Sequence, residues 1–168
     1  MVGDVPGAGR AAEKFALSIS PLDTARLAGS LHAGHAGAFV SFEGRVRNTD
    51  GTRTVVALEY DAYPPLCLKE GAAILSEALP GVIDARCVHR VGRLAVGDVA
   101  VWIGVIAGHR DEAFHACRFI IDEVKRRVPI WKKEHYRDGS SEWIGLGGSG
   151  ATGSAASPPA GPPPGGQE

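Results

Sequence analysis

The sequence predicts an α+β fold, in which a mixed or antiparallel sheet is covered by two main helices. Segments with the two-residue alternation of strands and segments with helical periodicity follow one another along the chain, joined by short connections that contain Gly or Pro. With 168 residues, 44% of them hydrophobic, the chain has the size and composition of one domain with its own core. We therefore expect one sheet with helices packed on one side.

Five strands and three helices are predicted. Strands are assigned where apolar residues alternate or run continuously, and helices where they recur every three or four residues. Proline marks the helix ends, because Pro21 suits a first helical position and Pro80 and Pro129 cannot continue a helix. In chain order the elements are a strand at 15–19, a helix at 21–31, strands at 38–46 and 55–60, a helix at 65–79, strands at 82–91 and 99–107, and a helix at 111–128.

Two of these elements carry further signals. Residues 99–107 are almost continuously apolar, which predicts a strand buried on both faces. Asp111 and Glu112 begin the last predicted helix, and residues 125–127 at its other end are all basic. This is the charge arrangement that the helix dipole favours.

The folded domain is predicted to span residues 14–146. Residues 1–13 and the Gly/Ser/Pro-rich tail at 147–168 offer too little apolar side chain to offset the entropy of ordering, and we expect both to be disordered. No apolar run approaches the roughly 20 residues that cross a bilayer, and the N-terminus lacks the apolar stretch of a secretory signal. These features predict a cytoplasmic protein without a membrane contact.

The composition argues against several classes of protein. Eighteen basic and 19 acidic residues give a net charge of −1, which is unlike a globally basic nucleic-acid-binding protein. Cys67, Cys87 and Cys117 are too widely spaced for a zinc motif and are expected to be reduced thiols in the core. We expect neither a metal nor a cofactor.

Basic side chains nevertheless gather where predicted elements end, which is where α/β layouts place ligand sites. Several cations that meet there would bind an anion such as phosphate or carboxylate. Each one taken singly is also compatible with a solvated surface charge. The set comprises Arg45, Arg47, His109, Arg110, Lys125, Lys132 and Lys133.

Lys125 is the most informative member of this set. On a helical wheel it lies about 20° from Phe114 and about 40° from Ile121, so it borders an apolar stripe that continues to Val124 and Val128. A partly desolvated amine has a lowered pKa and can act as a nucleophile or carry a proton. The alternatives are an amine kept charged by the helix C-terminus, or one that reaches out to water.

Two other motifs flank that helix. Arg110 lies where the helix begins and would clamp an anion near its free N–H groups, while His109 would bind substrate or carry a proton. A capping or surface histidine is the alternative for His109. Beyond the helix, Trp131 is expected to anchor the chain by packing, which gives Lys132 a rigid support suited to binding.

Five segments, taken together with their spacing, resemble one known family. They are FEGRVRN at 42–48, LEYDAYPPL at 58–66, HRVGRLAVGD at 89–98, AGHRDEAF at 107–114 and VKRRVPIWKKE at 124–134. On these segments the chain is similar to the MoaE family, the large catalytic subunits of molybdopterin synthase, and the resemblance implies their α/β hammerhead fold.

The resemblance implies an activity and partners. Such enzymes take sulfur from the thiocarboxylated C-terminal Gly-Gly tail of a small ubiquitin-like, MoaD-like subunit. They transfer it to cyclic pyranopterin monophosphate, which forms the dithiolene of molybdopterin for the molybdenum cofactor. The resemblance also implies a homodimer of the large subunit at the centre of a heterotetramer.

The resemblance extends to single residues. Lys125 matches the catalytic lysine of the family, and Lys132 matches a second functionally important lysine that also contacts substrate. Family members often add a basic residue from beyond the last tryptophan to the neighbouring subunit's site, but no Arg or Lys follows Trp143 here, and Arg137 is the candidate replacement. The other positions that match substrate-binding residues are Arg45, Val46, Arg47, His109, Arg110, Lys133 and Glu134.

Other functions remain open at this level. The same cations would suit a non-catalytic module that binds a phosphorylated ligand or a peptide ending in a carboxylate. A paralogue that keeps the fold without activity is a third reading, and the presence of both Lys125 and Lys132 argues against it.

Overall fold

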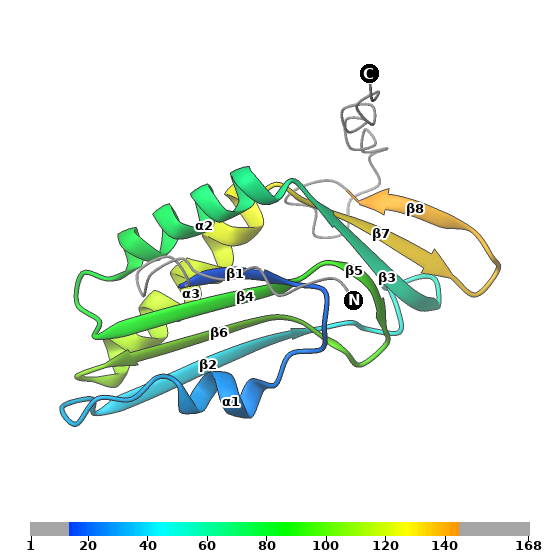
Figure 1. Ribbon diagram of the computed structural model, residues 1–168. Helices are drawn as coiled ribbons and strands as arrows, with labels where there is room; N and C mark the ends of the chain where they lie inside the picture. Colours follow the sequence, from blue (N-terminus) through cyan, green and yellow to red (C-terminus); the bar gives the residue numbers. More distant parts are fainter. Residues whose placement is uncertain (1–13, 145–168) are drawn as a thin grey trace, which may run out of the picture.

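Residues 14–144 are described in the computed structural model, and within them two four-stranded sheets pack with three helices (Figure 1). The disorder expected for residues 1–13 and 147–168 concerns segments outside the described residues. The elements are β1 (Phe15–Ser18), α1 (Thr24–Gly29), β2 (Ala38–Arg45), β3 (Val55–Ala62), α2 (Pro64–Ala78), β4 (Asp84–Arg90), β5 (Gly92–Ala95), β6 (Val99–Ala107), α3 (Arg110–Arg127), β7 (Ile130–Tyr136) and β8 (Ser141–Ile144).

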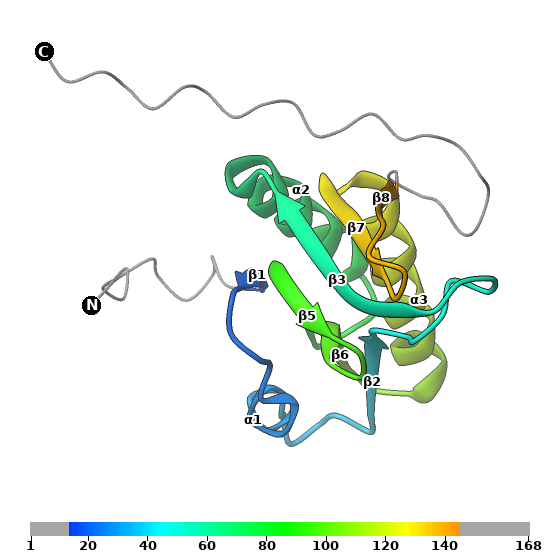
Figure 2. The same cartoon turned by 90° about the vertical axis from the view of Figure 1, so that its right-hand side faces the viewer.

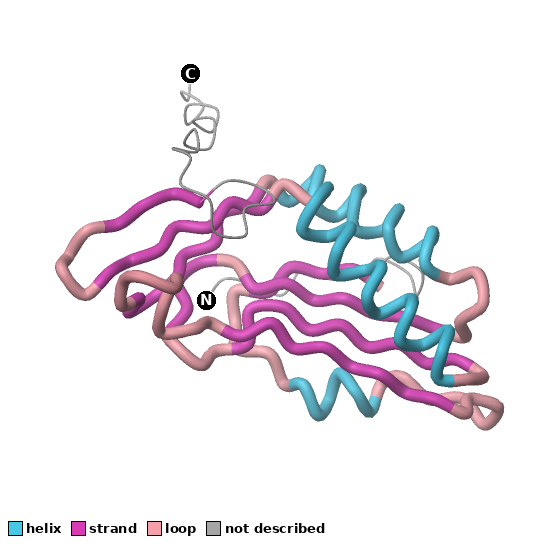
Figure 3. The backbone as a smooth tube through the Cα atoms, turned by 180° about the vertical axis from the view of Figure 1, so that it is seen from behind, coloured by secondary structure: helices cyan, strands magenta, loops and turns pink. Residues whose placement is uncertain are grey.

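The first sheet has the strand order β1-β4-β6-β2, with β1 parallel to β4 and the other pairs antiparallel. Helices α2 and α3 cover one face and the short α1 lies against the other (Figures 1 and 3). Alternate side chains of β6 serve the two faces, because successive residues of a strand point in opposite directions. Ile103 and Val105 pack under α2 and α3, whereas Trp102 and Ile106 pack on the side of α1.

The second sheet is antiparallel throughout, has the order β5-β3-β7-β8, and extends from one end of the first (Figures 1 and 2). A small apolar cluster joins the two sheets. Leu58, Leu94 and Tyr136 of the second sheet pack with Ala100 of β6 and with Val46, which follows β2. This cluster fixes the ends of β2 and β6 against β3 and β7.

The predicted α+β class and the two covering helices are confirmed, but the expectation of one sheet is wrong. Strands β5, β7 and β8 were not predicted, because their sequences lack a clear apolar alternation. The residues of β7, IWKKEHY, are mostly polar. Their pairing with β3 on one side and β8 on the other supplies the order that local sequence does not.

Two local predictions also need correction. Helix α1 begins at Thr24, because the Asp23 carboxylate accepts the backbone N–H of Arg26 at 3.0 Å and caps the helix there. Phe114 is 62% exposed, so it does not belong to the buried stripe of α3. That stripe is formed by Ala113, Ala116, Cys117, Ile120, Ile121 and Val124.

The three cysteines are free and buried, as predicted. None of the helices in residues 14–144 combines the length and the apolar character needed to cross a bilayer.

The contact between α2 and β1 generates a stability prediction. A Cβ atom added at Gly71 would overlap the ring of Phe15, whose side chain is fully buried against the helix. Gly71→Ala should therefore destabilise the fold by about 1–3 kcal/mol through overpacking, even though alanine favours helices by up to about 1 kcal/mol. Urea unfolding of the two proteins measures the difference.

Gly29→Ala is the matched control, because a Cβ at this other helical glycine would meet nothing within 4 Å. It should leave stability unchanged or raise it slightly. Equal stabilities of the Gly71→Ala variant and the wild type would contradict the tight packing of α2 on β1.

Candidate active site

A cavity of about 470 Å³ is lined by both sheets and by the C-terminal end of α3. Residues from β2, β3, β4, β6, β7 and β8 contribute to its wall, together with the segment that follows β2. The cavity therefore lies where the two sheets and the end of α3 come together. A volume of this size suits a small-molecule ligand.

Four basic side chains line this cavity: those of Arg45, Arg47, Lys125 and Lys132. Glu134 is the carboxylate among the lining residues. The sequence predicted that cations from the end of one strand, the end of a helix and the segment beyond it converge, and for these four residues the structure confirms it. Their summed charge makes the cavity a site for an anionic ligand.

The segment at the end of β2 presents its arginines at the cavity. The register of β2 against β6 shifts between Gly44 and Arg45, an irregularity of the kind that re-aims the side chains next to it. Arg45 donates to the Glu43 carboxylate at 2.6 Å. Val46 is buried in the cluster between the sheets, and its backbone N–H donates to the Asp98 carbonyl at 2.9 Å. Val46 thus fixes its neighbours and does not itself line the cavity.

Lys125 lies on the last turn of α3 and lines the cavity, but its side chain is exposed. The expected partial burial of this amine is therefore not found in the single chain. The expectation relied on Phe114 as a member of the apolar stripe. Phe114 faces solvent, so the stripe does not extend to the side of α3 that carries Lys125. Within residues 14–144 neither Lys125 nor Arg47 forms a salt bridge, so both are free to meet an anion.

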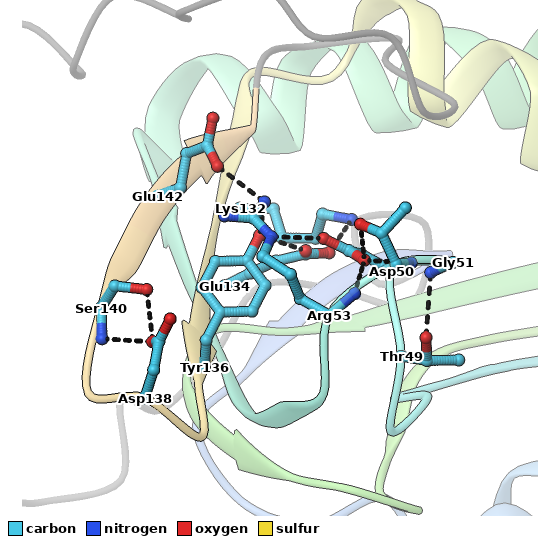
Figure 4. Close-up of polar contacts among 11 residues, drawn as sticks. Thr49, Asp50, Gly51, Arg53, Lys132, Glu134, Tyr136, Asp138, Ser140 and Glu142 are labelled. Carbon is cyan, nitrogen blue, oxygen red and sulfur yellow. Dashed lines mark hydrogen bonds and ion pairs between the residues drawn. The ribbon is translucent and has the colours of Figure 1, made fainter.

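Strand β7 separates residues that are adjacent in sequence. Lys132 and Glu134 point to the cavity and form an ion pair, with 2.9 Å between Nζ and Oε1 (Figure 4). Lys133 points to the opposite face, as strand alternation requires, and its amine lies 5.5 Å from the centre of the Trp143 ring. Of the predicted trio, only Lys132 and Glu134 share the cavity.

His109 and Arg110 do not reach this cavity within one chain. Arg110 is the first residue of α3 and Lys125 is close to its last, and 15 residues of helix separate them by about 22 Å. Arg110 is highly exposed and lies 3.7 Å from the carboxylate of its neighbour Asp111. The expected convergence of these two residues with Lys125 therefore fails in the monomer.

Two further cavity residues escaped the sequence reasoning. Tyr60 and His89 line the wall, with their rings 5.0 Å apart in an edge-to-face arrangement. Burial lowers the pKa of His89 to about 4, and its Nδ1–H donates to the Arg90 carbonyl at 2.7 Å. Burial, together with the nearby Glu134 carboxylate, raises the pKa of Tyr60 to about 12. Both groups are neutral at pH 7. The alternation of β3, which places Tyr60 on the same face as the cavity residue Leu58, is the sequence signal that could have identified Tyr60.

Arg90, the neighbour of His89, does not line the cavity and has a structural role. Its side chain is buried and donates to the Asp98 carboxylate at 3.0 Å. Among residues 14–144, no group of three or more His, Cys, Asp or Glu side chains is arranged to hold a metal ion.

Comparison with known proteins assigns the chain to a family. The profile of the family described as MoaE protein matches residues 17–127. The chain belongs to the MoaE family. A molybdopterin synthase catalytic subunit from Nostoc is 41% identical over 138 residues, which cover 80% of this chain and 84% of the relative.

Solved MoaE-type structures share the fold. Molybdopterin synthase from Staphylococcus aureus superposes with a TM-score of 0.74 at 38% identity, covering 79% of this chain and 98% of that one. A complex of subunits 1 and 2 of the molybdopterin-converting factor from Helicobacter pylori gives a TM-score of 0.64 at 24% identity, covering 74% of this chain and 86% of that one. The two-sheet arrangement is thus the MoaE fold.

The buried His89 generates a pH prediction. The unfolded chain binds a proton at this histidine near pH 6.5, whereas the folded chain does so only near pH 4. The unfolded state therefore holds more protons between these values, and stability falls as the pH is lowered through that window. The loss attributable to His89 should reach about 3 kcal/mol. Urea unfolding at a series of pH values measures it.

The comparison uses His89→Gln, which has no titrating group at this position. Its stability relative to the wild type should improve as the pH falls from 7 to 4. His115→Gln, at an exposed position of α3, is the matched control and should show no such trend. Parallel pH profiles for the wild type and His89→Gln would mean that His89 is not buried as described.

Proposed function

We propose that this chain is the catalytic subunit of a molybdopterin synthase, which transfers sulfur to cyclic pyranopterin monophosphate and so forms the dithiolene of molybdopterin. The single observation that carries the proposal is the cavity that brings Lys125 and Lys132 together with Arg45 and Arg47 in a MoaE-family chain. The relatives of this chain are themselves described as molybdopterin synthase catalytic subunits.

The charge of the cavity fits both reactants. The substrate carries a phosphate, and a thiocarboxylate sulfur donor is also an anion, so the two repel each other as they approach. Cations within a few ångströms of both lower that repulsion. Arg45 and Arg47 would hold the phosphate, and Lys132 would balance charge near the incoming thiocarboxylate or the phosphate. The wall formed by Tyr60 and His89 is neutral and suits the pterin ring.

The transfer itself needs proton movements near the reacting sulfur. The thiocarboxylate sulfur attacks a side-chain carbon of the substrate, so a C–S bond forms while a C–O bond of that carbon breaks and the oxygen leaves after it takes up a proton. Water then cleaves the acyl–sulfur bond, so the sulfur stays on the substrate and the carrier leaves as a carboxylate. We assign Lys125 to this step, either as general acid and base or as a transient amine partner of the acyl group. None of the three buried cysteines is required, since the donor brings the sulfur.

The proposed donor is a small ubiquitin-like, MoaD-like subunit, whose C-terminal Gly-Gly tail would enter the cavity. The Helicobacter pylori neighbour is a complex of two subunits, which supports a two-subunit enzyme. A homodimer of this chain at the centre of a heterotetramer is also part of the proposal. His109 and Arg110 begin the helix that Lys125 ends, so any contact of theirs with substrate would be to the cavity of a second copy.

Neither Lys133 nor Arg137 lines the cavity of its own chain, so neither is assigned a part in the transfer. Lys133 faces Trp143 on the outer side of β7, where it would contact substrate only after a rearrangement. A cytoplasmic location is likewise proposed, on the ground that the relatives are biosynthetic enzymes.

Replacement of Lys125 tests the proposal. In a mixture of the chain, the thiocarboxylated small subunit and cyclic pyranopterin monophosphate, Lys125→Ala should reduce dithiolene formation by at least about 100-fold, the scale expected for loss of general acid–base catalysis. Binding of the small subunit, measured by calorimetry, should be unchanged, because one exposed amine contributes little to a large interface.

Lys69→Ala is the matched control, since Lys69 is an exposed lysine on α2 that does not line the cavity. It should retain full activity. Near-wild-type product formation by Lys125→Ala would remove this residue from the mechanism. If the wild type binds the pterin and the thiocarboxylated tail but forms no dithiolene, the chain is the non-catalytic binding module instead.

A further inference from the structure

Arg53 connects the loop between β2 and β3 to the far edge of the second sheet. Its Nε donates to the Asp50 carboxylate at 3.0 Å, and its Nη2 donates to the Tyr136 hydroxyl at 2.6 Å and to the Glu142 carboxylate at 2.8 Å (Figure 4). The guanidinium carbon also lies 3.7 Å from the centre of the Tyr136 ring. One side chain thus joins the loop to β7 and β8.

The loop is folded around this arginine. The Asp50 carboxylate accepts the backbone N–H groups of Thr52 at 2.8 Å and Arg53 at 2.7 Å, which closes a tight turn. Thr49 and Thr54 pair across the base of the turn. Thr49 also lines the cavity. The position of this part of the cavity rim therefore depends on where Arg53 is held.

The hydrogen bond from Arg53 determines the direction of the next one. A guanidinium has only donors, so the Tyr136 oxygen accepts from Arg53 and its own hydrogen is directed elsewhere. That hydrogen is donated to the Glu134 carboxylate, with 2.9 Å between the Tyr136 oxygen and Oε2. Burial raises the pKa of Tyr136, and the hydrogen bond to Glu134 raises it further, so the phenol remains a donor.

Glu134 connects the Tyr136 hydroxyl to the cavity residue Lys132. Its side chain is 9% exposed, and its two oxygens are divided between partners, with Oε2 bound by Tyr136 and Oε1 paired with the Lys132 amine at 2.9 Å. Lys132, Glu134 and Tyr136 lie on one face of β7, two residues apart, as this contact requires. Arg53 and Tyr136 do not line the cavity, but hydrogen bonds through Glu134 connect them to Lys132, which does.

We propose that Arg53 and Tyr136 are positioning residues, which orient the Glu134 carboxylate and through it hold the Lys132 amine in place for the reaction. This inference rests on the proposed function. With Oε2 fixed by the phenol, the carboxylate cannot rotate, and Lys132 has one defined acceptor. Without that hydrogen bond either oxygen can face the amine, and Lys132 samples several positions. Sub-ångström placement of a reacting or charge-balancing group affects the chemical step strongly.

Tyr136→Phe tests this inference, because it keeps the buried ring and removes only the hydroxyl. The first measurement is the NMR signal of the Lys132 side chain, its 13Cε and 15Nζ resonances, assigned by their loss in Lys132→Arg. These resonances should shift in Tyr136→Phe, while those of the exposed Lys69 stay unchanged. The readout requires no activity, so it remains decisive if the wild type forms no product and the proposed function fails.

The second measurement is the rate of dithiolene formation. Tyr136→Phe should lower kcat by about 10-fold and leave KM for the small subunit unchanged, since a displaced Lys132 affects the chemical step. Arg53→Lys, which cannot bind Tyr136, Glu142 and Asp50 together, should show a loss in the same direction. Arg118→Lys is the matched control, because Arg118 forms an exposed salt bridge with Asp122 away from the cavity.

A purely structural role for Arg53 and Tyr136 gives a different pattern. Tyr136→Phe would then lower the melting temperature, while kcat and the Lys132 resonances would match those of the wild type. That result would overturn the inference. A shift of the Lys132 resonances with a 10-fold lower kcat, and neither change in Arg118→Lys, would support it.

Discussion

Helix α3 ends at Arg127, and this ending determines where both cavity lysines lie. Pro129 cannot continue the helical hydrogen bonds and forces the residue before it to be extended, and Val128 accordingly has φ −77° and ψ 121°. The chain then turns into β7, so that Lys125 on the last helical turn and Lys132 on the strand line one cavity. The Cys67 thiol donates to the Pro129 carbonyl at 3.2 Å, which ties this turn to α2.

The cavity combines two kinds of cation, and the difference follows from the elements that carry them. Arg45 and Lys132 lie on strands, and each is paired with a carboxylate two residues away in the sequence. Lys125 and Arg47 lie at a helix end and in a connecting segment, and neither has an acidic partner within residues 14–144. The ion pairs hold Arg45 and Lys132 in position, whereas Lys125 and Arg47 are available to pair with an anionic ligand.

Much of this arrangement could be predicted from the sequence, and the part that could not depends on pairing between distant segments. The apolar periodicity of α2, α3 and β6 predicted these elements, and Pro129 predicted the helix end. Strand β7 was missed because its polar sequence is ordered by β3 and β8. Because β7 was not predicted, the sequence analysis did not foresee that Lys132 and Lys133 point to opposite faces of a strand. The contact of His89 with Tyr60 was not predicted, because it joins strands of different sheets.

A crystal structure of the chain with cyclic pyranopterin monophosphate tests the central claim most directly, because it shows where the anion binds. The account predicts a phosphate between Arg45 and Arg47, with the pterin side chain within reach of the amines of Lys125 and Lys132. A ligand bound elsewhere on the protein, with neither amine in contact with it, would contradict the assignment of this cavity as the active site.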